Sequence, residues 1–184
     1  MTAAAGARPT ETAVIVPVPA TEPVVAGLRR RLDRAAAWGV PAHVTVLYPF
    51  VGPGQVDDAL VGRIADLTRD VPAFDCTFGR CGWFDDDVLW LVPDPDRPFR
   101  DLTAAFVDAF PDHPPYGGDY PDVVPHLTVG HRSSASPAEL RAAEAELTGR
   151  LPLTARIDHA TLIAGNDEPG SWHTVAVLPF GPEA

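Results

Sequence analysis

Two short segments decide the fold, His43-Val44-Thr45-Val46 and His126-Leu127-Thr128-Val129, because they repeat one His-x-Thr pattern 83 residues apart in a chain of 184 residues. Residues two apart on a β-strand point to the same face, so each histidine shares a face with its threonine. The apolar residues of each segment point to the opposite face. Each segment therefore predicts a strand that is buried at its back and carries a polar pair at its front.

The elements around the two segments also repeat. In the first half, apolar periodicity predicts a strand, a helix, the His-x-Thr strand, a helix and extended chain over residues 13–18, 21–36, 43–50, 56–67 and 71–84. The second half repeats this order over residues 88–92, 97–110, 125–131, 137–149 and 151–164, before a last strand at 172–180. Two β-α-β units that face each other across a pseudo-twofold axis would place both polar pairs in one central groove.

The length favours one domain, because two domains of ordinary size need more residues. We expect a single two-lobed domain over residues 12–184, with a first repeat at about 13–84, a second at about 88–164 and the last strand at about 172–180. Residues 1–11 lack the apolar core of a secretory signal and are expected to form a flexible leader. In the first helix, we expect the arginines to lie mostly on the solvated side: Arg29, Arg30, Arg31 and Arg34.

The charge of the chain limits its partners. All 14 basic residues are arginines, and the formal net charge is −11. Such a chain gains little from releasing counterions from a polyanion, so we expect a small nucleotide or an RNA end as partner and no long nucleic acid. No apolar stretch approaches the roughly 18 residues of a membrane span, and Cys76 and Cys81 are spaced to lie on opposite strand faces as free thiols. A monomeric cytoplasmic protein is expected.

The repeated segments resemble those of the two-histidine phosphoesterases, also called the LigT-like or 2′-5′ RNA ligase superfamily. The resemblance covers about residues 13–181 and is carried by Ala42-His43-Val44-Thr45-Val46-Leu47-Tyr48-Pro49-Phe50, by Val124-Pro125-His126-Leu127-Thr128-Val129-Gly130 and more loosely by residues 88–93. It implies a bilobal α+β fold with two antiparallel sheets around a central groove and helices outside. It also implies phosphodiester hydrolysis or formation without a cofactor, often on 2′,3′-cyclic phosphates or 2′-5′ linkages, with His43, Thr45, His126 and Thr128 as the motif residues.

The residue types fit this chemistry on their own terms. Opening a cyclic phosphate with water needs a base on one side of phosphorus and an acid on the other, and histidine titrates near neutrality. One of His43 and His126 would be the base and the other the acid, with the assignment open, while the hydroxyls of Thr45 and Thr128 could stabilise the charged oxygens. The sequence has no clustered metal-binding pattern, so no metal site is predicted.

We therefore expect a metal-independent cyclic phosphodiesterase. The alternatives are a 2′-5′ RNA ligase or 2′-5′ phosphodiesterase that uses the same site, and a binding module that holds a phosphorylated nucleotide without turnover. Substrate-binding candidates are Trp90, which could stack a base or belong to the core, and Tyr116 and Tyr120 in the Pro/Gly/Tyr loop at 114–121, which could cover the groove or be a packed connection. Arg132, just after the second motif strand, is a candidate phosphate ligand.

Overall fold

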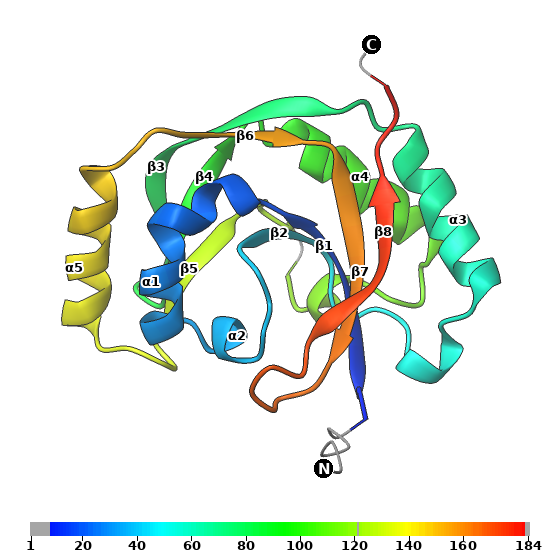
Figure 1. Cartoon of the computed structure of the whole chain (residues 1–184), viewed down its shortest axis with the longest axis horizontal. Helices are drawn as coiled ribbons and strands as arrows, with labels where there is room; N and C mark the ends of the chain where they lie inside the picture. The colour runs from blue at the N-terminus through cyan, green and yellow to red at the C-terminus, as the bar shows by residue number, and fades with distance from the viewer. Residues whose placement is uncertain (1–7, 121, 183–184) are drawn as a thin grey trace, which may run out of the picture.

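The computed structural model describes residues 8–120 and 122–182, and its strands form two four-stranded antiparallel sheets (Figure 1). Sheet one has the order β2-β1-β7-β8 and contains β1 (Glu11–Pro17), β2 (His43–Leu47), β7 (His159–Gly165) and β8 (His173–Pro179). Sheet two has the order β5-β4-β3-β6 and contains β3 (Phe74–Phe84), β4 (Val88–Asp94), β5 (Leu127–His131) and β6 (Leu153–Ile157). The predicted α+β class with two antiparallel sheets is confirmed.

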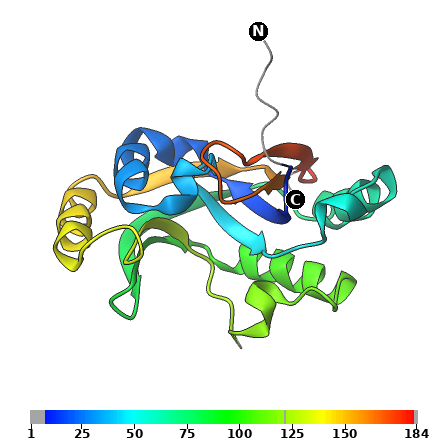
Figure 2. The ribbon, with the colours of Figure 1, turned by 90° about the horizontal axis from the view of Figure 1, so that it is seen from below.

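Four longer helices cover the sheets. They are α1 (Glu22–Leu32), α3 (Asp58–Arg69), α4 (Arg97–Ala109) and α5 (Pro137–Thr148). Helices α1 and α5 pack against β5 and β3 of sheet two, whereas α3 and α4 pack against β8 and β2 of sheet one. Figures 1 and 2 show α5 and α3 at opposite ends of the molecule. Helix α1 thus joins two strands of sheet one but packs on sheet two, and α4 does the reverse.

The division of the chain between the two sheets does not follow the order of the repeat. Strand β3, at the end of the predicted first repeat, lies between β4 and β6 of sheet two, and β7 returns to sheet one. The reason is local, because the three aspartates at 85–87 form a tight turn that joins β3 and β4 in one hairpin, with Asp85 at a φ of 48°. The predicted leader begins outside the described residues at 1–7, and β1 starts at Glu11.

Capping side chains decide where several helices begin. Ser136 and Glu139 form a capping box at the start of α5, with Glu139 N donating to Ser136 Oγ and Ser136 N to Glu139 Oε2. The single helix predicted over 21–36 is instead broken at Asp33, whose backbone is extended. Because the Asp33 carboxylate accepts a hydrogen bond from Ala35 N, it caps the separate short helix α2 (Arg34–Ala37).

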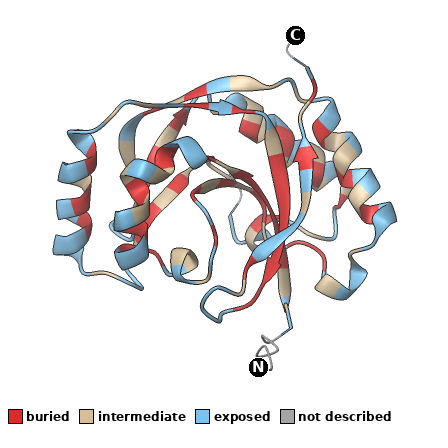
Figure 3. Ribbon diagram, in the orientation of Figure 1, coloured by how far each residue is buried: buried red, intermediate tan, exposed pale blue. Residues whose placement is uncertain are grey.

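One continuous cluster of buried apolar side chains joins the two sheets and their helices. Figure 3 shows buried residues in red on strands of both sheets and on the helices. The backs of the two motif strands belong to this cluster, as predicted, through Val44, Val46, Leu127 and Val129. Both cysteines are free. Among the described residues, no helix has the length and apolar character needed to span a bilayer.

Gly130 of β5 allows an especially close approach of two helices. A Cβ added there would lie 2.6 Å from Leu140 Cδ2 of α5 and 3.0 Å from Leu32 Cβ of α1. These distances are shorter than ordinary van der Waals contact, so a larger residue would require a shift of the Leu140 side chain or of α1. The second motif strand is therefore held directly against both helices that cover sheet two.

Candidate active site

The two motif strands are edge strands of their sheets, and they face each other. Strand β2 is the edge of sheet one, β5 is the edge of sheet two, and the two contact one another. His43, Thr45, His126 and Thr128 are half-buried and line one cleft of about 940 Å³ between sheet one and sheet two, which, with the helices packed on them, are called the two lobes below. The structure thus brings together the four residues that the repeat predicted to share a groove.

Each histidine makes the same hydrogen bond to the backbone. The Nδ1 atom of His43 lies 2.7 Å from the carbonyl oxygen of Pro41, and the Nδ1 atom of His126 lies 2.7 Å from that of Val124. A carbonyl only accepts hydrogen bonds, so Nδ1 carries the proton in both rings and Nε2 is left with its lone pair when the ring is neutral. The sequence offered no signal for these contacts, because any residue could supply the carbonyl.

The two histidines nevertheless have unequal surroundings. Burial lowers the pKa of His43 to about 3, and the positive charges of Arg29 and then of His126 act in the same direction, against the hydrogen bond to Pro41. Burial also lowers the pKa of His126, against the hydrogen bond to Val124. Both rings are therefore neutral in the free protein at pH 7, and a cation lowers the pKa of His43 only.

Arg29 does not lie on the solvated side of its helix, where the helical spacing had predicted it. Its side chain is only 3% exposed, and its guanidinium donates to the Asp33 carboxylate and to the carbonyl of Val40. Arg29 can be buried because the Asp33 carboxylate and the Val40 carbonyl together compensate its positive charge. Arg34 does line the cleft, with its guanidinium over the ring of Trp38.

The Pro/Gly/Tyr loop lines the cleft through both of its tyrosines. The amide of Tyr116 donates to the carbonyl of Tyr48, and the Tyr116 side chain hydrogen-bonds with Thr45, which ties the loop to the end of β2. Burial raises the pKa of Tyr116, whereas Tyr120 is 62% exposed and meets the Tyr116 ring edge-on at 5.6 Å. Pro121, the last residue of this predicted loop, lies outside the described residues.

Phe84, which was not predicted from the sequence, lines the cleft where Trp90 had been a candidate. Trp90 is 8% exposed and stacks under Phe84 at 4.8 Å, and the Phe84 ring meets the His126 ring edge-on at 4.8 Å. A Cβ on Gly82 would lie 2.7 Å from the indole of Trp90, so this glycine makes room for the indole. A glycine inside a strand was the available signal for such a close approach.

The last candidate from the sequence, Arg132, lies outside the cleft. It is exposed and is not among the residues that line the cleft, and its amide donates to the carbonyl of Asp87. Asp85, Asp87 and Asp122 stand along the cleft. Within residues 8–120 and 122–182, no three side chains of the metal-binding types His, Cys, Asp and Glu gather closely enough to hold an ion.

The sequence profile of the 2′-5′ RNA ligase superfamily matches residues 16–169. The chain belongs to this superfamily. The resemblance stated from the two His-x-Thr segments is thereby confirmed. No curated protein matches the sequence of this superfamily member.

Several solved structures have the same fold as this chain at low sequence identity. They include Escherichia coli LigT complexed with NADP⁺, with 17% identity, a TM-score of 0.58 and coverage of 95% of this chain and 99% of that one. LigT complexed with 3′-AMP gives 17% identity and a TM-score of 0.53, with 94% and 99% covered. The protein TT0787 of Thermus thermophilus gives 16% identity and a TM-score of 0.59, with 95% and 100% covered. The fold is therefore LigT-like over nearly the whole of both chains.

Proposed function

We propose that this protein is a phosphodiesterase that opens the cyclic phosphate of a small nucleotide or of an RNA end by acid-base catalysis between two histidines, without a metal ion. One observation carries the proposal. His43 at the start of β2 and His126 just before β5 line the same cleft, and each is held through Nδ1 by a backbone carbonyl, so that Nε2 remains for proton transfer. Each is followed by a threonine that lines the same cleft.

In this mechanism His43 is the base. Its pKa of about 3 keeps it neutral, so Nε2 accepts a proton from water as the water oxygen attacks phosphorus. His126 is the acid, because the negative charge of the bound phosphate raises its pKa and favours the protonated ring. The bond from phosphorus to the 2′ or 3′ oxygen breaks, and that oxygen takes the proton from His126 Nε2. The product is a nucleoside monophosphate, and the two rings regain their starting states by proton exchange with solvent.

The threonines complete the site. The hydroxyls of Thr45 and Thr128 donate hydrogen bonds to the non-bridging oxygens of the phosphate, where negative charge increases in the transition state. A hydroxyl suits this task over a wide pH range because it needs no ionisation.

Two features support a small nucleotide as substrate. The cleft of about 940 Å³ falls within the roughly 300–1,000 Å³ of small-molecule sites, and Phe84, Tyr116 and Tyr120 offer aromatic faces for a base. The related LigT was solved in complex with 3′-AMP, NADP⁺ and ATP. The net charge of −11 and the carboxylates along the cleft make long RNA a poor ligand. We expect this activity in the cytoplasm.

A substrate panel tests the proposal. The purified protein is incubated with a chelator and with each of the four 2′,3′-cyclic nucleotides or a 2′-5′-linked dinucleotide, and the products are separated by chromatography. We expect chelator-resistant hydrolysis of at least one cyclic nucleotide. If only the dinucleotide is turned over, the result favours the hypothesis of a 2′-5′ phosphodiesterase or ligase. If no compound is turned over, the result favours a binding module.

Single substitutions identify the catalytic pair. His43→Ala and His126→Ala should each lower kcat at least about 100-fold, the usual contribution of a catalytic acid or base. His173 is a matched control, because it begins a strand as His43 does and its Nδ1 also lies near a carbonyl two residues earlier, that of Ser171, but it is exposed on β8 and does not line the cleft. His173→Ala should keep wild-type activity. Near-normal kcat in both motif variants would exclude the mechanism.

A further inference from the structure

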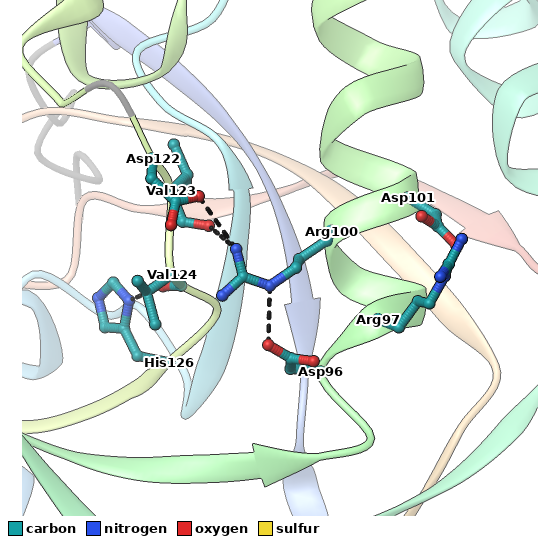
Figure 4. A network of polar contacts seen from close by, with 8 residues as sticks. All are labelled: Asp96, Arg97, Arg100, Asp101, Asp122, Val123, Val124 and His126. Carbon is teal, nitrogen blue, oxygen red and sulfur yellow. Dashed lines mark hydrogen bonds and ion pairs between the residues drawn. The ribbon is translucent and has the colours of Figure 1, made fainter.

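Arg100 of α4 holds the chain segment that leads to His126 (Figure 4). Its Nη1 atom donates to Asp122 Oδ1 at 3.1 Å and to the carbonyl oxygen of Val123 at 3.2 Å. Its Nε atom donates to Asp96 Oδ2 at 2.7 Å. The guanidinium is therefore fixed to its own helix on one side and to the segment before β5 on the other.

The position of this contact connects it to the active site. Val123 directly precedes Val124, whose carbonyl accepts the hydrogen bond from Nδ1 of His126 (Figure 4). The segment at 122–126 belongs to no helix or strand, because β5 begins only at Leu127. Arg100 thus fixes a stretch of backbone that the sheet does not fix, one residue from the carbonyl that orients the histidine.

The other lobe repeats this arrangement around His43. Arg29 donates through Nη1 to the carbonyl of Val40 at 3.1 Å, and Pro41, the next residue, supplies the carbonyl that accepts from His43 Nδ1. Arg29 Nε and Nη2 donate to Asp33 Oδ2 at 3.0 and 2.8 Å. In both lobes, the arginine contacts the carbonyl three residues before the histidine, and a carboxylate four residues away on the chain holds that arginine.

We propose that Arg29 and Arg100 are a pseudo-symmetric pair of positioning residues, each of which fixes the backbone carbonyl that sets the ring orientation and tautomer of its histidine. The helices that carry them, α1 and α4, occupy equivalent places in the repeat, each between a strand and the next His-x-Thr strand. The task needs arginine, because the forked guanidinium donates to a carboxylate and a carbonyl at once, whereas a lysine is a point charge on a flexible stem. The orientation of the histidine ring does not depend on any activity, whereas the effect of that orientation on turnover rests on the proposed phosphodiesterase function.

Arg100 is the better position for a test. Its side chain is 37% exposed, whereas removal of the buried Arg29 would leave Asp33 buried without its cation and destabilise the fold. The matched control is Arg97→Ala on the same helix, because the Arg97 side chain is 84% exposed and its ion pair, with Asp101, lies on the helix surface. Arg100→Ala, Arg100→Lys and Asp96→Asn, the last of which loosens Arg100 without shortening it, are compared with Arg97→Ala in thermal melts and in kinetics on the best cyclic nucleotide.

We expect Arg100→Ala to lower kcat about tenfold or more with KM changed less than about twofold, because a misaligned acid affects the chemical step more than binding. Arg100→Lys should not restore kcat, Asp96→Asn should give an intermediate loss, and Arg97→Ala should match the wild type. Wild-type kcat in a folded Arg100→Ala or Arg100→Lys variant would overturn the proposal.

A second readout does not depend on turnover. Nitrogen-15 spectra of the histidine rings report which nitrogen of His126 carries the proton. We expect one Nδ1-protonated form in the wild type and in Arg97→Ala, and a mixture of tautomers in Arg100→Ala. An unchanged His126 tautomer in Arg100→Ala would refute the positioning role even if the enzyme is active. A mixed tautomer in a protein that hydrolyses nothing in the panel would support the positioning role and refute the proposed function.

Discussion

The unequal surroundings of His43 and His126 predict an asymmetric pH dependence of kcat/KM. This parameter reports the ionisation of the free enzyme, and the active form has His43 neutral and His126 protonated. His43 has a pKa of about 3, and the pKa of His126 lies below its ordinary value of 6.5. The active form is therefore most abundant between the pKa of His43 and the lowered pKa of His126, and it decreases as the pH rises above the latter.

The size of the effect follows from these values. With the pKa of His126 below 6.5, less than about 10% of its rings are protonated at pH 7.5 and less than about 1% at pH 8.5, so kcat/KM should fall about tenfold over that interval. On the acid side, about 97% of His43 is still neutral at pH 4.5, which is 1.5 units above its pKa of about 3. We expect no loss of kcat/KM between pH 6 and pH 4.5.

The assay is the initial rate of 2′,3′-cyclic nucleotide hydrolysis at substrate concentrations well below KM, from pH 4 to pH 9 at constant ionic strength. Samples returned to pH 6 must regain full activity, which separates titration from acid unfolding. The profile of His173→Ala should match that of the wild type. A symmetric bell with both limbs within one unit of pH 6.5, or an acid limb above pH 5, would show that burial and Arg29 do not hold His43 neutral, and the assignment of His43 as the base would be withdrawn.

Three further outcomes follow from contacts in the structure. Thr128→Val should lower kcat about 100-fold and Thr45→Val by a similar factor, as loss of one transition-state hydrogen-bond donor does, and steady-state kinetics at fixed pH would measure both. Gly130→Ala should lower the free energy of unfolding by about 1–3 kcal/mol, because its Cβ overlaps Leu140, and an unchanged denaturant midpoint would contradict the close packing at β5. Phe84→Leu should raise KM for a purine cyclic nucleotide at least about fivefold, since base stacking on an aromatic ring contributes about 1–3 kcal/mol, and an unaltered KM would show that the base binds elsewhere.

Features that depend on near neighbours in the sequence could be predicted. The alternation of His43, Val44, Thr45 and Val46 indicated which face of β2 is buried, and the structure has this pattern. The capping box at Ser136 was readable for the same reason, because its partner is three residues away. The repeat then placed both polar pairs in one groove, since equivalent positions of two similar units face each other.

Features that depend on distant partners could not be predicted. The helical spacing of the arginines indicated a solvated face. Arg29 is nevertheless buried, because its guanidinium donates to a carbonyl eleven residues away and the helix ends before Asp33, its partner in an ion pair. The alternation in β4 did not decide whether Trp90 faces the cleft or the core. The register of β4 against β5 shifts between Leu89 and Trp90, and this shift cannot be seen in the sequence. Phe84, at the end of β3, stacks over Trp90 of the neighbouring strand β4, and such a contact between strands is not visible in the alternation of one strand.

The exchange of α1 and α4 between the sheets makes the two halves of the molecule mutually dependent. A cut in the turn at 85–87 would give an N-terminal fragment with only β1 and β2 of sheet one, and with α1 separated from the strand β5 that it covers. Neither fragment would have a complete hydrophobic core. Each is therefore expected to be insoluble by itself, and the two are expected to fold when they are mixed. The same interlocking opposes a hinge motion of one lobe against the other, because such a motion would separate α1 from β5 and α4 from β2.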